Sequence, residues 1–477
     1  MPQLYVAVLA IIVAVLLAVA IYRTTRVKTK ADYLVAGRSL PAFVLVLTLL
    51  TSWIGAGSLF AGAENAYRNG FAALWLPAGG WVGLLLIYFI APRARKFAQF
   101  TLPDLLEARY NQTARVLGTI AILFAYVGIT SYQFKGGGNV LHLIFPDKVT
   151  PELGTYIIAL FVIVTTALAG MSSVAYMDVA IGSLVTVICI IATPLLFLKA
   201  GGWAGLHAVL PASHFEVLGN LTLTRALEFM VPTMLLMLGN QVMYQKFFSA
   251  KSERDARISV IGWILGTILL ETLIVSIAVF GSALYTTGEV ARQPYEIIPY
   301  TARNGLPALM GALLLGAVFA KVISTASNYL FSPATNLIND VFVRYIAPDA
   351  SNKRVMIVSR LAVVLLGIWA LFQAIYAPSI LAKMLWAYTI YSAALTPVVL
   401  AAFYSKRVTA WGAVAAIAGG TVVTLAWDLP AVRGLFPHII ADRDAIFPAL
   451  FVAVAALIVV SLFTPPPKSA QLAQFAE

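Results

Sequence analysis

Apolar residues fill long stretches of the chain, and short polar segments separate these stretches. A run of about 20 apolar residues crosses the hydrocarbon core of a bilayer as an α-helix. Averaging the hydropathy in a sliding window gives about thirteen such runs. They are Leu4–Tyr22, Leu40–Tyr67, Phe71–Ile90, Arg115–Gln133, Leu153–Ala169, Val174–Leu198, Ala226–Tyr244, Ile258–Leu284, Leu306–Phe331, Met356–Ile375, Ser379–Tyr404, Trp411–Trp427 and Phe447–Phe463. The pattern predicts an all-α membrane protein with about thirteen transmembrane helices.

Two of the predicted spans contain helix-breaking residues beside polar ones. Leu40–Tyr67 contains Gly55 and Gly57, and Ala226–Tyr244 contains Gly239. A glycine inside a helix costs about 1 kcal/mol relative to alanine. Such glycines can serve close packing between neighbouring helices. They can also interrupt a helix at a binding site, and the polar neighbours favour this second interpretation.

These two interrupted spans are predicted to form the centre of an inverted repeat. Their starts are five spans apart, an odd number, so the two helices enter the membrane from opposite sides. Paired broken helices of this kind meet near the midplane, where unwound carbonyl groups can replace the hydration shell of a small cation. We predict one transmembrane transporter domain, 1–477. It comprises a first span and cytoplasmic loop (1–39), two five-helix inverted repeats (40–200 and 224–405), two accessory spans (406–464) and a cytoplasmic tail (465–477).

A third polar cluster lies in the ninth predicted span. Lys321, Ser324, Thr325 and Asn328 recur at intervals of one, three and four residues and therefore share one helix face. Adjacent hydroxyl groups suit a hard cation, which prefers oxygen ligands. The alternative is that the hydroxyls bond to carbonyl groups of their own helix.

Composition supports the membrane assignment. Of the 477 residues, 61% are hydrophobic and 11% are charged, whereas a soluble domain carries about 25% charged residues. The single cysteine, Cys189, lies in an apolar run, which excludes a disulfide framework.

The net charge of +12 is explained by membrane topology. With the N-terminus outside, twenty-one of the 32 lysines and arginines, Lys246 among them, fall on the cytoplasmic side, ten fall outside, and Lys321 lies within a span. This bias follows the positive-inside rule. We therefore expect a multi-pass protein of the inner membrane with a cytoplasmic C-terminus. The charge requires no nucleic-acid partner.

Several segments of the chain resemble the sodium/solute symporters, a family that includes bacterial proline, sialic acid and galactose carriers. The resemblance rests on segments in order along the chain: DYLVAGRSLP, TLPDLLEARY, MYQKFFSAKSERDAR, ISTASNYLFSPATNLINDVFVRYI and FYSKRVTAWGAVAAIAGG. It implies a broken-helix, inverted-repeat transporter with its N-terminus outside.

The resemblance also implies the positions of two binding sites. Sodium would bind the main-chain oxygens of Thr51 and Ile54 and the hydroxyls of Ser324 and Thr325, with Asp178 close by. The solute would lie beside the sodium ion. Its candidate ligands are Ser58, Asn240 and Gln241, with Thr389 and Ser392 as further candidates.

Lys321 departs from the family pattern, which has a small residue at this position. A lysine inside a span costs about 2.5–3.5 kcal/mol on insertion scales unless it is paired or reaches water. The ammonium group could pair with Asp178 or Glu64, bind a substrate carboxylate, or take the place of sodium. It could also be packed behind the site without a charge.

The function that we predict is sodium-coupled symport of a small organic solute into the cell by alternating access, and a carboxylate-bearing or zwitterionic solute is favoured. One alternative is a sodium-independent or proton-coupled transporter in which Lys321 replaces the ion. Another is a membrane solute sensor on the same scaffold, which would carry a cytoplasmic signalling domain after the last span. No motif of a metalloprotease, nucleophile elbow or P-loop is present, so we do not expect an enzyme.

Overall fold

The computed structural model describes residues 2–25, 29, 32, 35–97, 101–168, 171–287, 293–376, 379–468 and 472. Among these residues the secondary structure is helical, apart from an isolated bridge between Leu40 and Ala250. The helices of the first half are α1 (Pro2–Thr24), η1 (Ala36–Arg38), α3 (Ala42–Trp53), η2 (Gly57–Gly62), α4 (Ala63–Asn69), η3 (Gly70–Leu74), α5 (Trp75–Phe97), α6 (Leu102–Arg109), α7 (Gln112–Ile144), α8 (Pro151–Leu168), α9 (Met171–Lys199), α10 (Gly202–Val209) and η4 (Ala212–Phe215).

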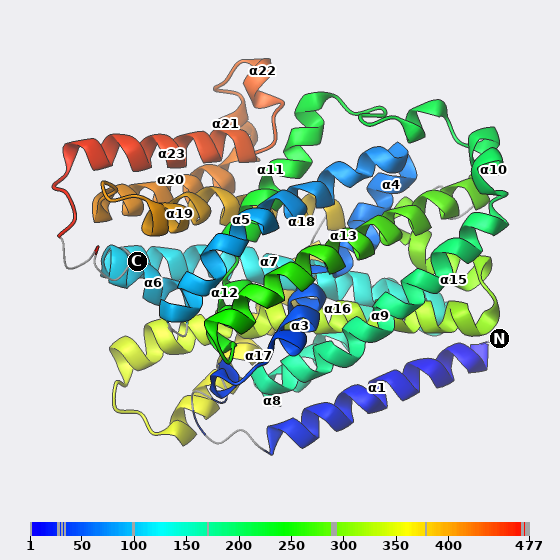
Figure 1. The fold of residues 1–477 in the computed structure, drawn as a ribbon, viewed down its shortest axis with the longest axis horizontal. Helices are drawn as coiled ribbons and strands as arrows, with labels where there is room; N and C mark the ends of the chain where they lie inside the picture. The colour runs from blue at the N-terminus through cyan, green and yellow to red at the C-terminus, as the bar shows by residue number, and fades with distance from the viewer. Residues whose placement is uncertain are drawn as a thin grey trace.

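The second half continues with α11 (Leu223–Gly239), α12 (Gln241–Ser249), α13 (Glu253–Leu284), η5 (Pro294–Glu296), α15 (Ile297–Gly305), α16 (Ala308–Asn336), η6 (Leu337–Ile346), α17 (Asn352–Tyr376), α18 (Ile380–Ala394), α19 (Thr396–Tyr404), α20 (Ala410–Trp427), α21 (Pro430–Arg433), α22 (His438–Ala441) and α23 (Ile446–Phe463). The start of α1 and the end of α23 lie at opposite ends of the long axis (Figure 1).

Eleven helices in the described part of the chain are long and apolar enough to cross a membrane. Two shorter apolar helices, Gln3–Val19 and Ala42–Trp53, add to them. The predicted count of thirteen spans is not confirmed. One reason is that the chain stays helical through α4 and η3, so Gly57–Arg95 runs on as a single stretch.

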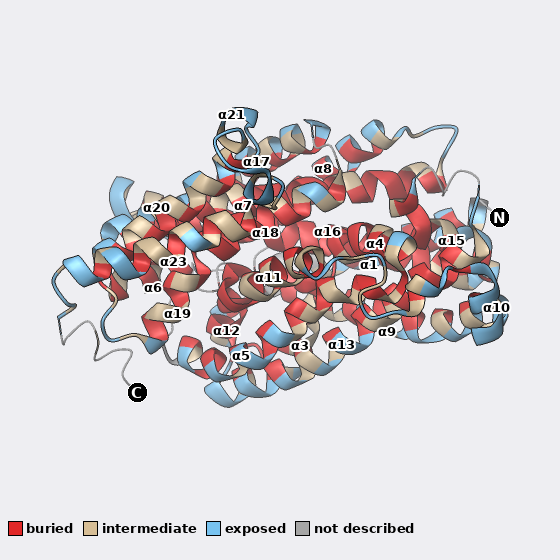
Figure 2. Ribbon diagram, turned by 90° about the horizontal axis from the view of Figure 1, so that it is seen from above, coloured by how far each residue is buried: buried red, intermediate tan, exposed pale blue. Residues whose placement is uncertain are grey.

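The burial pattern is that of a helical bundle in lipid. Helices α7 and α16 run through the middle of the molecule, α1 lies along one edge, and α20 packs against α23 along another (Figure 1). Buried residues concentrate at the centre and exposed residues lie around the rim (Figure 2). Large apolar side chains such as Leu265, Phe372 and Phe451 are exposed on the outside, which is typical of a surface that faces hydrocarbon.

Both predicted helix interruptions are present. Helix α3 ends at Trp53, because Ile54 has an extended backbone (φ −78°, ψ 120°), and the π-helix η2 follows. Helix α11 ends at Gly239, because Asn240 is extended (φ −63°, ψ 113°), and α12 then begins. Carbonyl and amide groups at these breaks lose their partners within the helix and become available to side chains or ligands.

Candidate ion and solute sites

Four oxygen atoms converge where α3 ends. The Thr325 hydroxyl on α16 lies 3.1 Å from the carbonyl oxygen of Thr51 and 2.9 Å from that of Ile54. It also lies 3.0 Å from the carbonyl oxygen of Lys321, one turn earlier on α16. One hydroxyl proton can satisfy only one of three acceptors at a time. The cluster is therefore rich in oxygen atoms that a small cation can bind.

Glycine permits this close approach of α16 to the break. A Cβ atom added at Gly55 would lie 2.8 Å from the Thr325 hydroxyl oxygen and 2.8 Å from Gln133 Nε2. Gln133 in turn accepts a hydrogen bond from the Ala56 amide at 2.7 Å, which satisfies one of the groups freed by the break. Gly55 thus serves both close packing and the interruption, the two interpretations of the sequence pattern.

Asp178 on α9 joins this cluster through Ser324. The Ser324 hydroxyl donates to Asp178 Oδ1, and the Thr48 hydroxyl donates to Asp178 Oδ2. All three side chains are buried. The structure therefore brings together the five residues predicted for the sodium site, Thr51, Ile54, Asp178, Ser324 and Thr325; their binding of sodium remains a prediction.

Lys246 is buried inside the protein, which the charge distribution along the sequence does not predict. The charge distribution assigns it to the cytoplasm, whereas its side chain is fully buried on α12. Its Nζ lies 3.3 Å from Asp178 Oδ2 and 2.9 Å from Asn328 Oδ1, and it also contacts the Thr48 hydroxyl. The predicted span ends at Tyr244, two residues earlier, but α12 continues to Ser249 and carries Lys246 into the core.

Lys321 forms neither of its predicted ion pairs. Its Nζ donates to the carbonyl oxygen of Leu50 at 3.2 Å, in the last turn of α3. Among the described residues, Asp178 is paired with Lys246, and Glu64 is paired with Arg68 at 3.0 Å. Lys321 nevertheless interacts electrostatically with Asp178 and with a second buried acid, Glu271.

Glu271 is a site residue that the sequence pattern does not predict. It lies on α13, 4% exposed, and its Oε1 accepts a hydrogen bond from Ser58 at 2.8 Å. Together with Asp178, Lys246 and Lys321, it makes a set of four buried charges that cancel at their formal values. Buried charges are stable only when they are compensated, so this balance indicates one coupled electrostatic unit.

Glu271 and Ser58 also line a cavity beside the α3 break. The other lining residues include Trp53, Thr233, Met384 and Tyr388, from α3, α11 and α18. The cavity has a volume of about 20 Å³, enough for about one water molecule. A solute would therefore require movement of the lining side chains.

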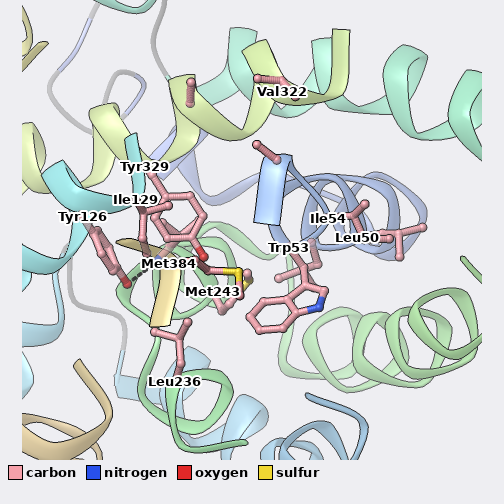
Figure 3. Packing of buried hydrophobic residues seen from close by; sticks show 14 of the residues in the cluster. Leu50, Trp53, Ile54, Tyr126, Ile129, Leu236, Met243, Val322, Tyr329 and Met384 are labelled. Carbon is pink, nitrogen blue, oxygen red and sulfur yellow. Dashed lines mark hydrogen bonds between the residues drawn. The ribbon is translucent and has the colours of Figure 1, made fainter. Parts of the chain in front are cut away.

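Aromatic and apolar side chains form one wall of this cavity. The rings of Trp53 and Tyr388 stack with their centroids 6.1 Å apart, and Figure 3 shows Trp53 at the end of α3 together with Leu50 and Ile54. The indole N–H of Trp53 lies near the Glu271 carboxylate but makes no hydrogen bond of ordinary geometry within the described residues. The cavity thus offers a carboxylate, a hydroxyl and an indole N–H group beside an apolar surface.

Other parts of the protein occupy both polar atoms of the Asn240 side chain and the amide oxygen of Gln241, whereas Gln241 Nε2 has no hydrogen-bond partner within the described residues. Asn240 Oδ1 accepts from Tyr126 Oη at 2.8 Å, and its Nδ2 donates to Tyr329 Oη at 2.9 Å. Gln241 Oε1 accepts from the Leu102 amide at 2.5 Å. Within the described part of the chain, neither residue lines the cavity, and their binding of solute stays a prediction.

Thr389 and Ser392 lie on the same helix, α18, but have different surroundings. The Ser392 hydroxyl donates to the Pro232 carbonyl at 2.7 Å, which joins α18 to α11. Thr389 lines a second cavity of about 240 Å³, whose charged residues are Glu64, Arg225, Asp428 and Asp444. Burial raises the pKa of the Asp444 carboxyl, and Arg225, 2.6 Å away, acts in the opposite direction. Within the described residues, neither Thr389 nor Ser392 lines the smaller cavity.

A charged network joins α6 to α7 and to η6. Arg115 on α7 lies 2.6 Å from Asp104 and 2.7 Å from Asp340, and it also pairs with Glu107. Arg344 pairs with Glu107 at 2.9 Å. Because Gln241 accepts from the Leu102 amide, this network is connected to the second helix break.

Comparisons with known proteins agree with this architecture. Residues 33–420 of this chain match the profile of the sodium:solute symporter family. The osmoregulated proline transporter OpuE of Bacillus subtilis (strain 168) is 23% identical over 463 residues, covering 93% of this chain and 92% of that protein. A sodium/proline symporter of Staphylococcus aureus is 26% identical over 462 residues, covering 92% of this chain and 88% of that protein.

Solved structures share the fold. A Na+-coupled sialic acid symporter superposes with a TM-score of 0.82 at 18% identity, covering 98% of both chains. A nucleobase-cation-symport-1 family transporter gives a TM-score of 0.60 at 13% identity, covering 94% of this chain and 99% of that one. The predicted all-helical fold with two discontinuous helices is thereby confirmed; the boundaries of its predicted parts stay a prediction.

Proposed function

Because this chain belongs to the sodium:solute symporter family, we propose that sodium binds at the α3 break and that a zwitterionic solute binds in the cavity lined by Glu271. Family membership makes the protein a sodium-coupled symporter of a small organic solute, with Na+ as the coupling ion, and not an enzyme. The positions of both ligands, the class of solute and the orientation of the termini belong to the proposal.

The observation that carries the ion site is the contact of Thr325 with the carbonyl oxygens of Thr51, Ile54 and Lys321, at 2.9 to 3.1 Å. Neutral carbonyl and hydroxyl oxygens are suitable ligands for a monovalent cation, and main-chain carbonyls at a broken helix are a recurring source of them. A sodium ion here would turn the Thr325 hydroxyl so that its oxygen faces the ion. Ser324 would contribute a further oxygen and connect the ion to Asp178.

The solute class follows from the groups that line the cavity. The carboxylate of Glu271 can accept hydrogen bonds from a primary or secondary ammonium group, and charge-assisted bonds of this kind are the stronger ones. The Trp53 N–H can donate to a solute carboxylate once it turns away from Glu271. Since the relatives are proline transporters by name, an amino or imino acid is the favoured solute, and Trp53 and Tyr388 would pack against its apolar part.

Alternating access would then require the two sides of the site to open in turn. On the proposed outer side, the cavity lined by Thr389 and Trp386 supplies the approach. On the proposed cytoplasmic side, the Arg115 network closes the path by holding α6 against α12. This orientation places the N-terminus outside and the C-terminus in the cytoplasm of a bacterial cell.

Uptake into proteoliposomes tests the proposal. Purified protein would be assayed with radiolabelled L-proline, and competition would be measured with other amino acids, with monocarboxylates that lack an amine, and with amines that lack a carboxylate. We expect uptake only with external sodium, and competition only by solutes that carry both groups. Uptake that is competed equally well by simple monocarboxylates would contradict the role given to Glu271. Uptake that persists in choline would contradict the ion site.

A further inference from the structure

Lys246 is held like a bound cation. Its Nζ contacts three oxygen atoms of different chemistry: the Asp178 carboxylate at 3.3 Å, the Asn328 amide oxygen at 2.9 Å and the Thr48 hydroxyl. An ammonium group has three N–H donors, so these contacts use its full capacity. The three partners come from α9, α16 and α3, and all of them are buried.

We propose that the Lys246 ammonium is a tethered cation that fills a second cation position beside Asp178, so that the transporter takes up a single sodium ion at the α3 break. A carboxylate, a hydroxyl and an amide oxygen are also the ligands that a free monovalent cation would use. This inference rests on the proposed sodium site only for the number of ions. The second position itself is defined by Lys246 and its partners.

The position is distinct from the sodium site but connected to it. Asp178 uses Oδ2 for Lys246 and Thr48, and it uses Oδ1 for Ser324. Ser324 precedes Thr325, whose hydroxyl faces the break. A charge at Lys246 therefore satisfies Asp178 before sodium arrives, and sodium binding leaves that pair intact.

Shortening the Lys246 side chain should make the folded protein require a free cation at the position of the ammonium group. With Lys246 shortened to alanine, Asp178 would remain buried without a countercharge, and the space left by the side chain would be open beside three oxygen ligands. A cation from solution can stabilise that arrangement, because binding to the folded state alone raises stability as its concentration rises. A purely structural ion pair predicts a loss of stability with no new ion dependence.

The test requires no knowledge of the solute. Detergent-purified protein would be titrated with NaCl against choline chloride at constant ionic strength, and the thermal midpoint and the intrinsic tryptophan fluorescence would both be recorded. The variants are Lys246→Ala, Lys246→Met, the double variant Asp178→Asn with Lys246→Met, and Lys251→Ala as an exposed control. Lys246→Met fills the space without a charge and so leaves no room for an ion.

We expect the thermal midpoint of the Lys246→Ala variant to rise with the logarithm of the sodium concentration about twice as steeply as that of the parent and of Lys251→Ala, because two ions rather than one bind its folded state. Lys246→Met should be less stable than the parent at every sodium concentration, and the double variant, which has no buried carboxylate at residue 178 to compensate, should recover that stability. A folded Lys246→Ala variant that titrates like the parent would overturn the proposal. If Lys246→Ala does not fold, a double variant that is no more stable than Lys246→Met would overturn it as well.

The experiment distinguishes failure of the proposed sodium site at the α3 break from failure of the proposed role of Lys246. Thr325→Ala in the parent should remove the single sodium response, whereas Thr325→Ala combined with Lys246→Ala should retain one. If the parent shows no sodium response at all, the proposed site at the break is wrong. A response gained by Lys246→Ala would still support the tethered cation.

Discussion

The hydroxyl of Thr325 lies 2.9 Å from the carbonyl oxygen of Ile54, the residue at which α3 stops being helical. This contact joins α16, near the middle of its length, to the broken helix of the other half of the protein. Any ion bound between these two oxygens would bridge the two elements directly. The contact can therefore couple the occupancy of the ion site to the relative position of α3 and α16.

Thr325→Ala should weaken sodium binding more than solute binding. The substitution removes one oxygen ligand and leaves the three carbonyl oxygens in place, so we expect about a ten-fold rise in the sodium concentration for half-maximal uptake. Thr325→Ser should restore most of the affinity. Thr424→Ala is a matched control, because the Thr424 hydroxyl is buried but bonds only to Gly420 of its own helix, at 2.8 Å. Sodium activation curves in proteoliposomes that coincide for Thr325→Ala and the parent would exclude Thr325 as a ligand.

Glu271→Gln should change solute recognition. The amide keeps the shape of the side chain and removes its charge, so a solute ammonium would lose a charge-assisted bond. We expect the apparent KM to rise about ten-fold or more, with a smaller change in the sodium concentration for half-maximal uptake. Ser58→Ala removes only the bond to Oε1 and should have a weaker effect. An unchanged KM in Glu271→Gln would mean that the carboxylate serves the balance of buried charges alone.

Lys321→Met should bind sodium more tightly than the parent. Methionine is close to lysine in length, and the carbonyl oxygen of residue 321 stays in place, but a positive charge close to the ion site is lost. Removing a like charge in a partly polar interior should lower the half-maximal sodium concentration about five-fold, equivalent to about 1 kcal/mol. The measurement compares both proteins with sodium or choline at pH 6 and 8. Sodium-independent uptake by the parent that becomes sodium-dependent in Lys321→Met would instead identify Lys321 as the replacement for the ion.

Asn240→Ala should lower stability more than it changes transport affinity. Asn240 is the N-cap of α12 and also bonds Tyr126 and Tyr329, so its side chain is engaged in three bonds to the protein. Losing a cap of this kind costs about 1–2 kcal/mol, which should appear as a lower thermal midpoint. Asn304→Ala, on the exposed end of α15, provides the control. A large rise in KM at an unchanged midpoint would place Asn240 in the solute site.

Hydropathy and the helix-breaking residues determine the main lines of the architecture from the sequence alone. The apolar runs require helices, since backbone polar groups cannot remain unpaired in hydrocarbon. Gly55 and Gly239 mark the two interruptions within a residue or two of where the backbone becomes extended at Ile54 and Asn240. These features are local, so the order of residues along the chain contains the information.

The burial and the pairing of the charged residues in the core were decided only by the tertiary structure. Hydropathy assigns Lys246 to the cytoplasm because an averaging window ends at the first polar residues it meets, although α12 continues into the core. Glu271 sits in a strongly apolar helix, and its neighbour Ser58 is 213 residues away in the chain. Pairing of Lys321 with Asp178 is one expectation from the sequence, but Lys246 takes that partner. Partner choice among buried charges depends on the direction of side chains from four helices at once, and that direction is set by packing, which no local pattern records.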